Sequence, residues 1–418
     1  MTTHTEVQST GTMPDAIVVG AGPVGSYAAL NLAKLGAHVS VFEEHPTIGL
    51  PSHCAGHISI RSLRSIGLYP LPNGIVENTF KTANFYSPVG TKFSLHLQKP
   101  VTCALNRAHF DQYIAKQAQE AGAHFHLGTY VQSLISQDGF VKGVNMQRNG
   151  TKIQETVHCK IVLDAEGVSS RLLRQAGLKA LKPEGLIYAV EAEVDSIQDT
   201  ESDSVEVYFG KSYAPGFYGW LIPRLDGTAK VGLATNHGNP QEYLKRLMTK
   251  HPIASKQLRN AKITQIGYHA ITLGGPIERT YGNGFLAIGD CASQVKPTTG
   301  GGVIFGLISA KIAAETTNQA LQRGDVSSEA LQGYQKRCSD TMSFDFSVML
   351  RLRRFLDSLS DSRLDDLLRY CDKLGVDRAL SDVDEIDFQG KMILTALRKP
   401  SMIAALIYFA LLYLTANP

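Results

Sequence analysis

Three glycines and one acidic residue near the N-terminus have the spacing of a phosphate-binding turn. Gly20, Gly22 and Gly25 follow an apolar run at residues 16–19 and form the pattern Gly-x-Gly-x-x-Gly. The first glycine of this pattern permits a tight turn, the second lets a pyrophosphate approach the backbone, and the third lets a helix pack close to the strand. Glu43, eighteen residues after Gly25, is placed to bond a ribose hydroxyl. The pattern predicts a dinucleotide site, and the alternative is a glycine-rich turn in an ordinary α/β domain.

A second glycine-rich turn lies far along the chain. A strand pattern ends at Asp290, and a run of three glycines at residues 300–302 leads into a helical pattern at 303–315. A helix N-terminus offers free N–H groups and a positive dipole end to a polar ligand. No second Gly-x-Gly-x-x-Gly pattern opens its own βαβ unit. We therefore expect one large cofactor that spans both turns.

Cysteine and histidine side chains gather in the loop that follows Glu43. Residues 51–57 read Pro-Ser-His-Cys-Ala-Gly-His, which is too rich in proline and glycine for a long helix. A thiol at Cys54 could face a bound ligand there, and His53 and His57 could lower its pKa or relay a proton. One alternative is that Cys54 is a small buried apolar residue. Another is a zinc site, for which no fourth ligand is evident.

An aromatic pair and an arginine complete the candidates. Tyr218 and Trp220 lie two residues apart in a strand pattern, so their side chains point to the same face. They could wall a site for an apolar ligand, and the alternative is aromatic core packing. Arg107 precedes a predicted helix and could face a phosphate or ribose, and the alternative is a solvated arginine.

The periodicity of the chain predicts the elements that position these residues. Apolar runs at 16–19 and 38–42 flank a predicted helix from residue 26 to about 35. Residues 185–272 alternate apolar and polar side chains, which is typical of an antiparallel sheet with one packed face. Further predicted elements are a helix at 58–66, a hairpin at 82–97, a helix that starts just after Arg107 and runs to about 121, and strands at 124–127, 130–136, 141–147 and 152–158.

Composition excludes several classes of protein. The 418 residues are 43% hydrophobic and 19% charged, with a net charge of +3, so nothing indicates a nucleic-acid partner. The six cysteines are scattered and form no Cys-x-x-Cys pair, which favours a reduced protein without a structural metal. The first fourteen residues lack the basic and apolar regions of a signal peptide. We therefore expect a cytoplasmic protein.

An apolar run near the C-terminus raises the question of a membrane. Residues 402–414 are thirteen consecutive apolar residues, preceded by Arg398 and Lys399. As a helix they would extend about 20 Å, which is shorter than the roughly 30 Å hydrocarbon core of a bilayer. The run either packs inside the protein or dips into a membrane surface beside its basic pair.

The two turns and the inserted sheet resemble the FAD-dependent fold of the aromatic hydroxylases, over residues 15 to about 316. The resemblance implies that the first turn holds the ADP half of FAD, that Arg107 approaches the phosphates, and that Asp290 bonds the linker. The start of the helix that follows the three glycines at 300–302 would offer N–H groups to the isoalloxazine O2 and stabilise the anionic reduced flavin. The implied cofactor contacts are Gly20, Gly22, Pro23, Gly25, Glu43, Cys54, Ala55, Arg107, Asp290, Gly300, Gly301, Gly302 and Val303.

With this resemblance, the expected fold is α/β, with a Rossmann-like FAD-binding domain, an inserted antiparallel-sheet substrate domain and a C-terminal helical region. The expected FAD-binding domain is discontinuous. The boundaries are a flexible tail at 1–14, the FAD-binding domain at 15–80, 100–184 and 276–325, the substrate domain at 81–99 and 185–275, and the helical region at 326–418.

Two shorter motifs resemble the geranylgeranyl reductases. Pro51 to Gly56 is similar to their P-x-x-C-x-G loop, and Tyr218 to Pro223 is similar to their Y-x-W-x-F-P motif, with Ile222 in place of phenylalanine. The resemblance implies that reduced FAD passes a hydride to a double bond of an isoprenoid chain, with Cys54, Tyr218 and Trp220 as catalytic residues. The loop and the overall length are closest to the type that acts on archaeal digeranylgeranylglycerophospholipids. Such an enzyme would be peripheral at a membrane surface.

Two other functions stay open at this point. An FAD- and NADPH-dependent monooxygenase of the same fold would use oxygen and a polar aromatic pocket. A prenyl-binding escort protein without flavin would tolerate decay of the nucleotide site, whereas Gly20, Gly25 and Asp290 are all present. The sequence does not identify the electron donor of a reductase, which could be NADPH, ferredoxin or another reductant.

Overall fold

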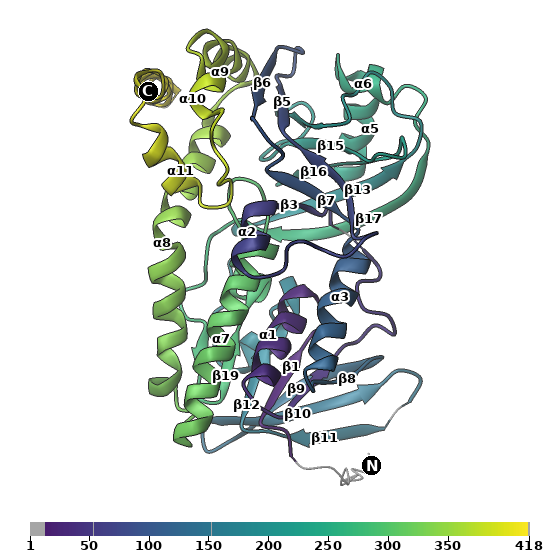
Figure 1. Ribbon diagram of the computed structural model, residues 1–418, viewed down its shortest axis with the longest axis vertical. Helices are drawn as coiled ribbons and strands as arrows, with labels where there is room; N and C mark the ends of the chain where they lie inside the picture. The colour runs from purple at the N-terminus through teal and green to yellow at the C-terminus, as the bar shows by residue number, and fades with distance from the viewer. Residues whose placement is uncertain (1–12, 53, 152, 417–418) are drawn as a thin grey trace.

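The first glycine turn belongs to a six-stranded sheet at one end of the molecule (Figure 1). The computed structural model describes residues 13–416 apart from residues 53 and 152, with side chains up to residue 409. The sheet order is β18-β19-β12-β1-β2-β8, and β1 pairs in parallel with both β12 and β2. Its strands are β1 (Ala16–Val19), β2 (Val39–Phe42), β8 (His124–His126), β12 (Ile161–Asp164), β18 (Tyr281–Gly282) and β19 (Phe285–Ala287).

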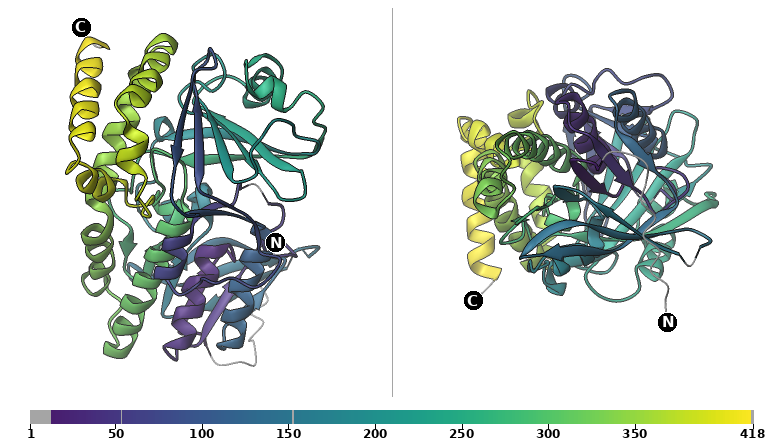
Figure 2. Two further views of the ribbon diagram at one scale, coloured as in Figure 1. Left: turned by 45° about the horizontal axis from the view of Figure 1, so that its top comes forward. Right: turned by 90° about the horizontal axis from the view of Figure 1, so that it is seen from below.

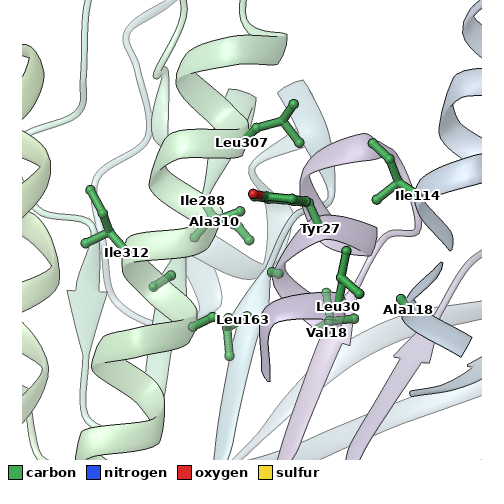
Figure 3. Close-up of a cluster of buried hydrophobic side chains, with 14 of the residues drawn as sticks. Val18, Tyr27, Leu30, Ile114, Ala118, Leu163, Ile288, Leu307, Ala310 and Ile312 are labelled. Carbon is green, nitrogen blue, oxygen red and sulfur yellow. The ribbon is translucent and has the colours of Figure 1, made fainter. Parts of the chain in front are cut away.

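Both faces of this sheet are covered, which explains why its central strands are almost entirely apolar. On one face pack the helices α1 (Pro23–Lys34), α3 (Arg107–Glu120) and α7 (Val303–Arg323). Figure 3 shows this layer, with Val18 and Leu163 of the sheet facing Tyr27 of α1 and Leu307 of α7. On the other face packs the sheet β11-β10-β9, formed by β9 (Thr129–Gln137), β10 (Phe140–Arg148) and β11 (Gln154–His158). The strands predicted at 124–158 are thus confirmed.

A seven-stranded sheet forms the other end of the molecule. Its order is β17-β13-β16-β15-β14-β5-β6. The strands are β5 (Thr82–Tyr86), β6 (Lys92–His96), β13 (Leu186–Val194), β14 (Ser204–Tyr208), β15 (Gly219–Pro223), β16 (Ala229–Thr235) and β17 (Ile263–Thr272). The pairing is antiparallel except between β14 and β5, which are parallel. The departure arises because the β5–β6 hairpin comes from a distant part of the chain and joins the edge of the inserted sheet.

Two helix boundaries differ from the sequence prediction. Helix α1 begins at Pro23 instead of residue 26, because proline suits the first turn of a helix. The predicted helix at 58–66 is a short strand, β3 (His57–Ser59), followed by α2 (Ile60–Ser65). Ser59 separates them, since its side chain accepts a hydrogen bond from Ser62 N and caps α2. β3 belongs to the small sheet β3-β7-β4, with β7 (Thr102–Leu105) and β4 (Val76–Phe80).

Helices of the C-terminal region run along one flank and touch both ends of the molecule (Figure 2). They are α8 (Ser328–Ser358), α9 (Asp361–Lys373), α10 (Val376–Leu380), α11 (Gln389–Ala396) and α12 (Pro400–Ala416). α8 packs along α7, and α9 and α10 pack against β6. The long α8 therefore contacts both the part of the molecule with the six-stranded sheet, through α7, and the part with the seven-stranded sheet, through Arg353, which donates to Gly216 O.

The apolar run at 402–414 lies in α12 and has two faces. Met402 and Ala405 are buried, whereas Ile403 is 46% and Ile407 is 58% exposed. Packing inside the protein therefore does not describe the whole helix over its described side chains, and contact of its exposed face with a membrane surface stays a prediction. No single helix among the described residues is long and apolar enough to cross a membrane, and only the pair Gln389–Ala396 and Pro400–Phe409, bent by 119°, meets that test by length and composition. Most of the predicted tail, residues 1–12, lies outside the described residues.

Candidate cofactor and substrate site

Two of the three glycines in the first turn are closely surrounded by backbone atoms, and the third is not. A Cβ on Gly20, where φ is +95°, would lie 2.5 Å from Ala165 O, and a Cβ on Gly25 would lie 2.0 Å from Gly20 O. The fold itself therefore requires these two glycines. A Cβ on Gly22 would meet nothing within 4 Å. Gly22 thus opens onto space at the N-terminus of α1, as expected where a pyrophosphate approaches the backbone.

Glu43 lies where β2 ends, beside this turn. One carboxylate oxygen accepts a hydrogen bond from Ala21 N at 2.7 Å, and the other accepts one from His45 N at 2.9 Å. The side chain is 12% exposed. Its carboxylate is therefore fixed next to the glycine turn, in the position predicted for a ribose contact.

Asp290 and the triple glycine form the second turn. A Cβ on Gly302 would lie 2.7 Å from Asp290 Oδ1, so the carboxylate packs directly against the start of α7. Among the described residues no side chain caps Gly302 or the first turn of α7. Burial raises the pKa of Asp290, and Arg107 opposes that shift. The backbone N–H groups of this long helix are thus available to a polar ligand, as FAD binding requires.

Arg107 is the first residue of α3 and is not solvated, so that alternative was wrong. Its side chain is 11% exposed and donates through Nε and Nη2 to both carboxylate oxygens of Asp111, at 3.1 Å each. Burial lowers the pKa of Arg107, but the Asp111 carboxylate and the nearby Cys54 raise it by more. Arg107 therefore lies close to both Cys54 and Asp290 as a fixed cation, and its contact with the phosphates stays a prediction.

A cavity of about 290 Å³ lies between the second turn and the inner face of the seven-stranded sheet. It brings together residues that are far apart in the sequence and were predicted separately. Predicted residues in its lining are Cys54, Ala55, Tyr218, Trp220, Gly300 and Gly301. The predicted catalytic residues and the predicted flavin end of the cofactor site thus share one space.

Hydrogen bonds fix the positions of both aromatic side chains, Tyr218 and Trp220. Tyr218 donates its hydroxyl proton to Thr299 O at 3.0 Å, and Trp220 Nε1 donates to Glu191 Oε2 at 3.2 Å. Their rings meet edge to face, with centroids 6.1 Å apart. Trp220 belongs to an apolar cluster and also lines the cavity. Core packing and a role in the cavity are therefore compatible for Trp220.

The positively charged residue next to Cys54 is not the one that the sequence analysis predicted. Burial, and then Lys296, lowers the pKa of His57 to about 4, although the ring is open to the cavity that it lines. His57 is neutral near pH 7 and does not act on Cys54 as a cation, whereas its predicted role as a proton relay stays a prediction. Arg107 is the cation beside Cys54 instead. His53 lies outside the described residues.

Cys54 is half-buried, whereas the other five cysteines, all free, are buried. The expectation of a simple buried thiol therefore does not hold for Cys54. Among the described residues no group of three or more His, Cys, Asp or Glu side chains could hold a metal ion.

Several cavity residues were missed by sequence reasoning. Lys296 lies in the loop between Asp290 and the triple glycine, His269 comes from β17, and Ile386 and Gln389 come from the C-terminal region. Lys230 anchors the Cys54 loop from below, since its ammonium donates to Ala55 O at 3.4 Å and Leu105 O at 3.2 Å. A lone lysine in the apolar pattern of residues 229–235 was the available signal for this residue.

A second cavity of about 230 Å³ adjoins the first and is mostly apolar. The two share His57, Ala83, Phe85, Val205, Ile386 and Gln389 in their linings. Beyond these shared residues the second cavity is lined by five apolar and three polar residues, which are Phe80, Leu95, Leu97, Val101, Met392, Lys81, Thr82 and Thr102. The two adjoining cavities lie between the seven-stranded sheet and the C-terminal region, and we call them the channel.

Comparisons with known proteins agree with this geometry. Residues 13–343 match the FAD binding domain family. The chain is 36% identical over 363 residues to digeranylgeranylglycerophospholipid reductase 2 of Methanothermobacter thermautotrophicus, covering 85% of this chain and 91% of that protein. It is 31% identical over 395 residues to digeranylgeranylglycerophospholipid reductase 2 of Methanopyrus kandleri, covering 93% of this chain and 97% of that protein.

Solved structures show the same architecture. A geranylgeranyl bacteriochlorophyll reductase-like protein from Thermoplasma acidophilum superposes with a TM-score of 0.84 at 27% identity, covering 95% of this chain and 99% of that one. A flavin-dependent brominase superposes with a TM-score of 0.66 at 20% identity, covering 86% of this chain and 93% of that one. The second similarity is one of fold alone.

Proposed function

Because the chain belongs to the digeranylgeranylglycerophospholipid reductase family and carries an FAD binding domain, we propose that it saturates carbon–carbon double bonds of geranylgeranyl chains on archaeal-type glycerophospholipids. The observation that carries the proposal is the cavity, in which Cys54, Tyr218 and Trp220 face the glycines of the second turn. The mostly apolar second cavity that adjoins it suits an isoprenoid chain. The monooxygenase alternative is less supported, because the relatives that cover most of the chain are named as reductases.

The residues of the chain bind and orient the reactants. The chemistry that FAD would supply, when bound and reduced, is a hydride for one carbon of a trisubstituted double bond. Gly22 and Arg107 would hold its phosphates, Glu43 its ribose, and Asp290 its linker. The free N–H groups at the start of α7 would favour the anionic reduced flavin. Tyr218 and Trp220 wall the cavity, exclude water and hold the double bond against the second turn.

A proton must reach the other carbon of the double bond. Cys54 Sγ is the donor in this proposal, and the thiolate that remains is stabilised by the guanidinium of Arg107 until solvent returns the proton. His57 is a poor donor, since its pKa of about 4 leaves it neutral near pH 7. Reduction of bound FAD between turnovers would require an external electron donor.

We also propose that the enzyme works at the cytoplasmic surface of a membrane, as a peripheral protein. Leu394, Ile403 and Ile407 of α11 and α12 are exposed large apolar side chains near the basic residues Arg398 and Lys399. Apolar side chains beside cations are typical of a segment that rests on an anionic lipid surface.

An anaerobic experiment tests the proposed function. The protein is purified, its visible spectrum is recorded, the flavin is reduced with dithionite, and a geranylgeranyl glycerophospholipid is added. We expect flavin reoxidation without oxygen, with the lipid mass rising by two units for each bond. Reoxidation only on admission of oxygen would favour the monooxygenase, and a protein that cannot be loaded with FAD would exclude both enzymes.

A further inference from the structure

An irregular segment at residues 381–388, between α10 and α11, crosses beside the channel, and we call it the strap. Its inner side includes Ile386, which lines both cavities, and Asp387, which is 1% exposed. Its outer side forms a groove of about 550 Å³ together with α11. Met392 of α11 lines both this outer groove and the second cavity. The strap therefore separates the channel from the outer groove.

The inner side of the strap is fastened to the loop of the second turn by polar contacts. Asp387 pairs with Lys296, whose side chain is 12% exposed, and accepts a hydrogen bond from Ser62 Oγ at 2.5 Å. Next to it, Thr298 donates to Gln389 Oε1 at 2.7 Å. Lys296 and Thr298 lie in the loop that also contains Gly300 and Gly301. The strap thus closes directly onto the wall of the cavity where we place the flavin.

The outer side of the strap is held by exposed pairs. Arg61 pairs with Asp384 and lies 3.5 Å from Glu385, and Gln98 Nε2 donates to Asp382 at 2.6 Å. Exposed pairs of this kind contribute little to stability, because water replaces them at small cost. A buried ion pair also gains little over apolar packing, but it fixes one arrangement and penalises the loss of a single partner. The inner contacts, together with the packing of Phe388 on Phe305, therefore define the closed strap, and the exposed outer pairs add little to it.

We propose that the strap is the gate through which the isoprenoid chain enters the channel, that the outer groove takes the chain first, and that the Lys296–Asp387 pair is the latch. The inference rests on the proposed function, which supplies the ligand. The lining of the groove combines charged side chains with apolar side chains of Phe388, Met392 and Ala396. The same helix α11 carries the exposed Leu394, so a chain drawn from a lipid surface would meet the groove before the channel. Opening the strap joins the groove to the cavities at Met392.

Cys54 allows access through the gate to be measured without turnover. It is the half-buried cysteine of the cavity, while the other five are buried. The FAD-loaded protein is labelled with N-methylmaleimide and, separately, with N-decylmaleimide, and modification at Cys54 is followed by peptide mass spectrometry. The ratio of the two rates reports passage of an alkyl chain, because both reagents attack the same thiolate.

Asp387→Asn removes the charge of the latch and keeps its size. We expect this variant to raise the ratio of decyl to methyl labelling about fivefold, since one buried charged partner is lost. Thr298→Val, which removes only the contact with Gln389, should raise it by a smaller factor. Arg148→Gln, which breaks an exposed pair with Glu155 on the distant sheet of β10, is the matched control and should leave the ratio unchanged.

An unchanged ratio in both Asp387→Asn and Thr298→Val, with Cys54 still labelled by the small reagent, would overturn the gate. Labelling of all six cysteines would reveal unfolding in Asp387→Asn, and the decision would then rest on Thr298→Val. Because the measurement needs no catalysis, failure of the gate is distinct from failure of the reductase, which the anaerobic lipid experiment decides.

Discussion

At the scale of single residues, the proposed proton donor can be tested directly. Cys54→Ala removes the thiol beside Arg107 and leaves the glycine turns intact. We expect the rate of lipid-driven flavin reoxidation to fall about a hundredfold, which is the usual size of a general-acid contribution. The measurement is anaerobic stopped-flow absorbance after dithionite reduction. Cys371→Ala, which removes a buried thiol of the C-terminal region, is the control. Equal rates in Cys54→Ala and wild type would assign the proton to water.

The carboxyl group behind Trp220 gives a pH prediction. Burial raises the pKa of Glu191 to about 7, against the partial opposition of Lys230 and Trp220. The folded protein then holds a proton that the unfolded chain loses at lower pH, so this group destabilises the fold as pH rises from about 4.5 to about 7. The loss is at most about 3 kcal/mol.

Glu191→Gln should remove this dependence, because a glutamine still accepts the hydrogen bond of Trp220. Relative to wild type, the free energy of unfolding of the variant should increase between pH 5 and pH 7.5, as measured by urea denaturation. Glu120→Gln on the exposed end of α3 is the control. Parallel pH profiles for wild type and Glu191→Gln would show that Glu191 is ionised throughout the range.

At the scale of elements, the first turn separates the needs of folding from those of the cofactor. Gly25→Ala would place a Cβ 2.0 Å from Gly20 O, so α1 could no longer pack on the end of β1, and we expect a loss of several kcal/mol of stability. Gly22→Ala meets no protein atom within 4 Å and should change stability by less than about 1 kcal/mol. FAD affinity should nevertheless fall at least about tenfold, because the methyl group occupies the path of the pyrophosphate.

Thermal unfolding of the apoprotein and fluorescence titration with FAD measure these two effects separately. If Gly22→Ala binds FAD as tightly as wild type does, the phosphates of FAD do not approach the backbone at Gly22. The contrast is informative because the two glycines belong to one motif and differ only in their surroundings.

The sequence predicts an element well when the residues that determine it lie close together in the chain, and poorly when they lie far apart. The first turn, Glu43 and the β5–β6 hairpin follow from patterns within about twenty residues, and the structure confirms these elements. The partners of Lys296 could not be predicted, since Asp387 is 91 residues away and lies in an irregular segment without periodicity. The prediction for His57 could not include Lys296, which helps to lower the pKa of His57 and lies far away in the sequence. The cavity is also formed by segments that are distant in the sequence. The sequence therefore predicted the motifs that contribute to the cavity but did not predict all of its lining residues.

At the scale of the whole molecule, α8 ties the two sheet layers together and the later helices turn an apolar face outward. The exposed residues Ile403 and Ile407 lie on α12, beyond the FAD binding domain match that ends at residue 343. The reaction itself does not need these side chains, because they do not line the two cavities. Their exposed position supports the proposed contact with a lipid surface.

The double variant Ile403→Ser with Ile407→Ser tests this role. Each isoleucine inserted into a lipid surface would contribute on the order of 1 kcal/mol, given its partial exposure in solution, so the pair should lower the partition coefficient about tenfold or more. The measurement is co-sedimentation with vesicles of anionic phospholipid, at constant ionic strength. Ile263→Ser, which changes a 49% exposed isoleucine on β17, is the control and should bind as wild type does. Because neither isoleucine lines the cavities, turnover of lipid dissolved in detergent should be unaffected while turnover of lipid in vesicles falls. If both substrates are reduced at wild-type rates and vesicle binding persists, α12 is an ordinary structural helix and the lipid reaches the groove from another surface.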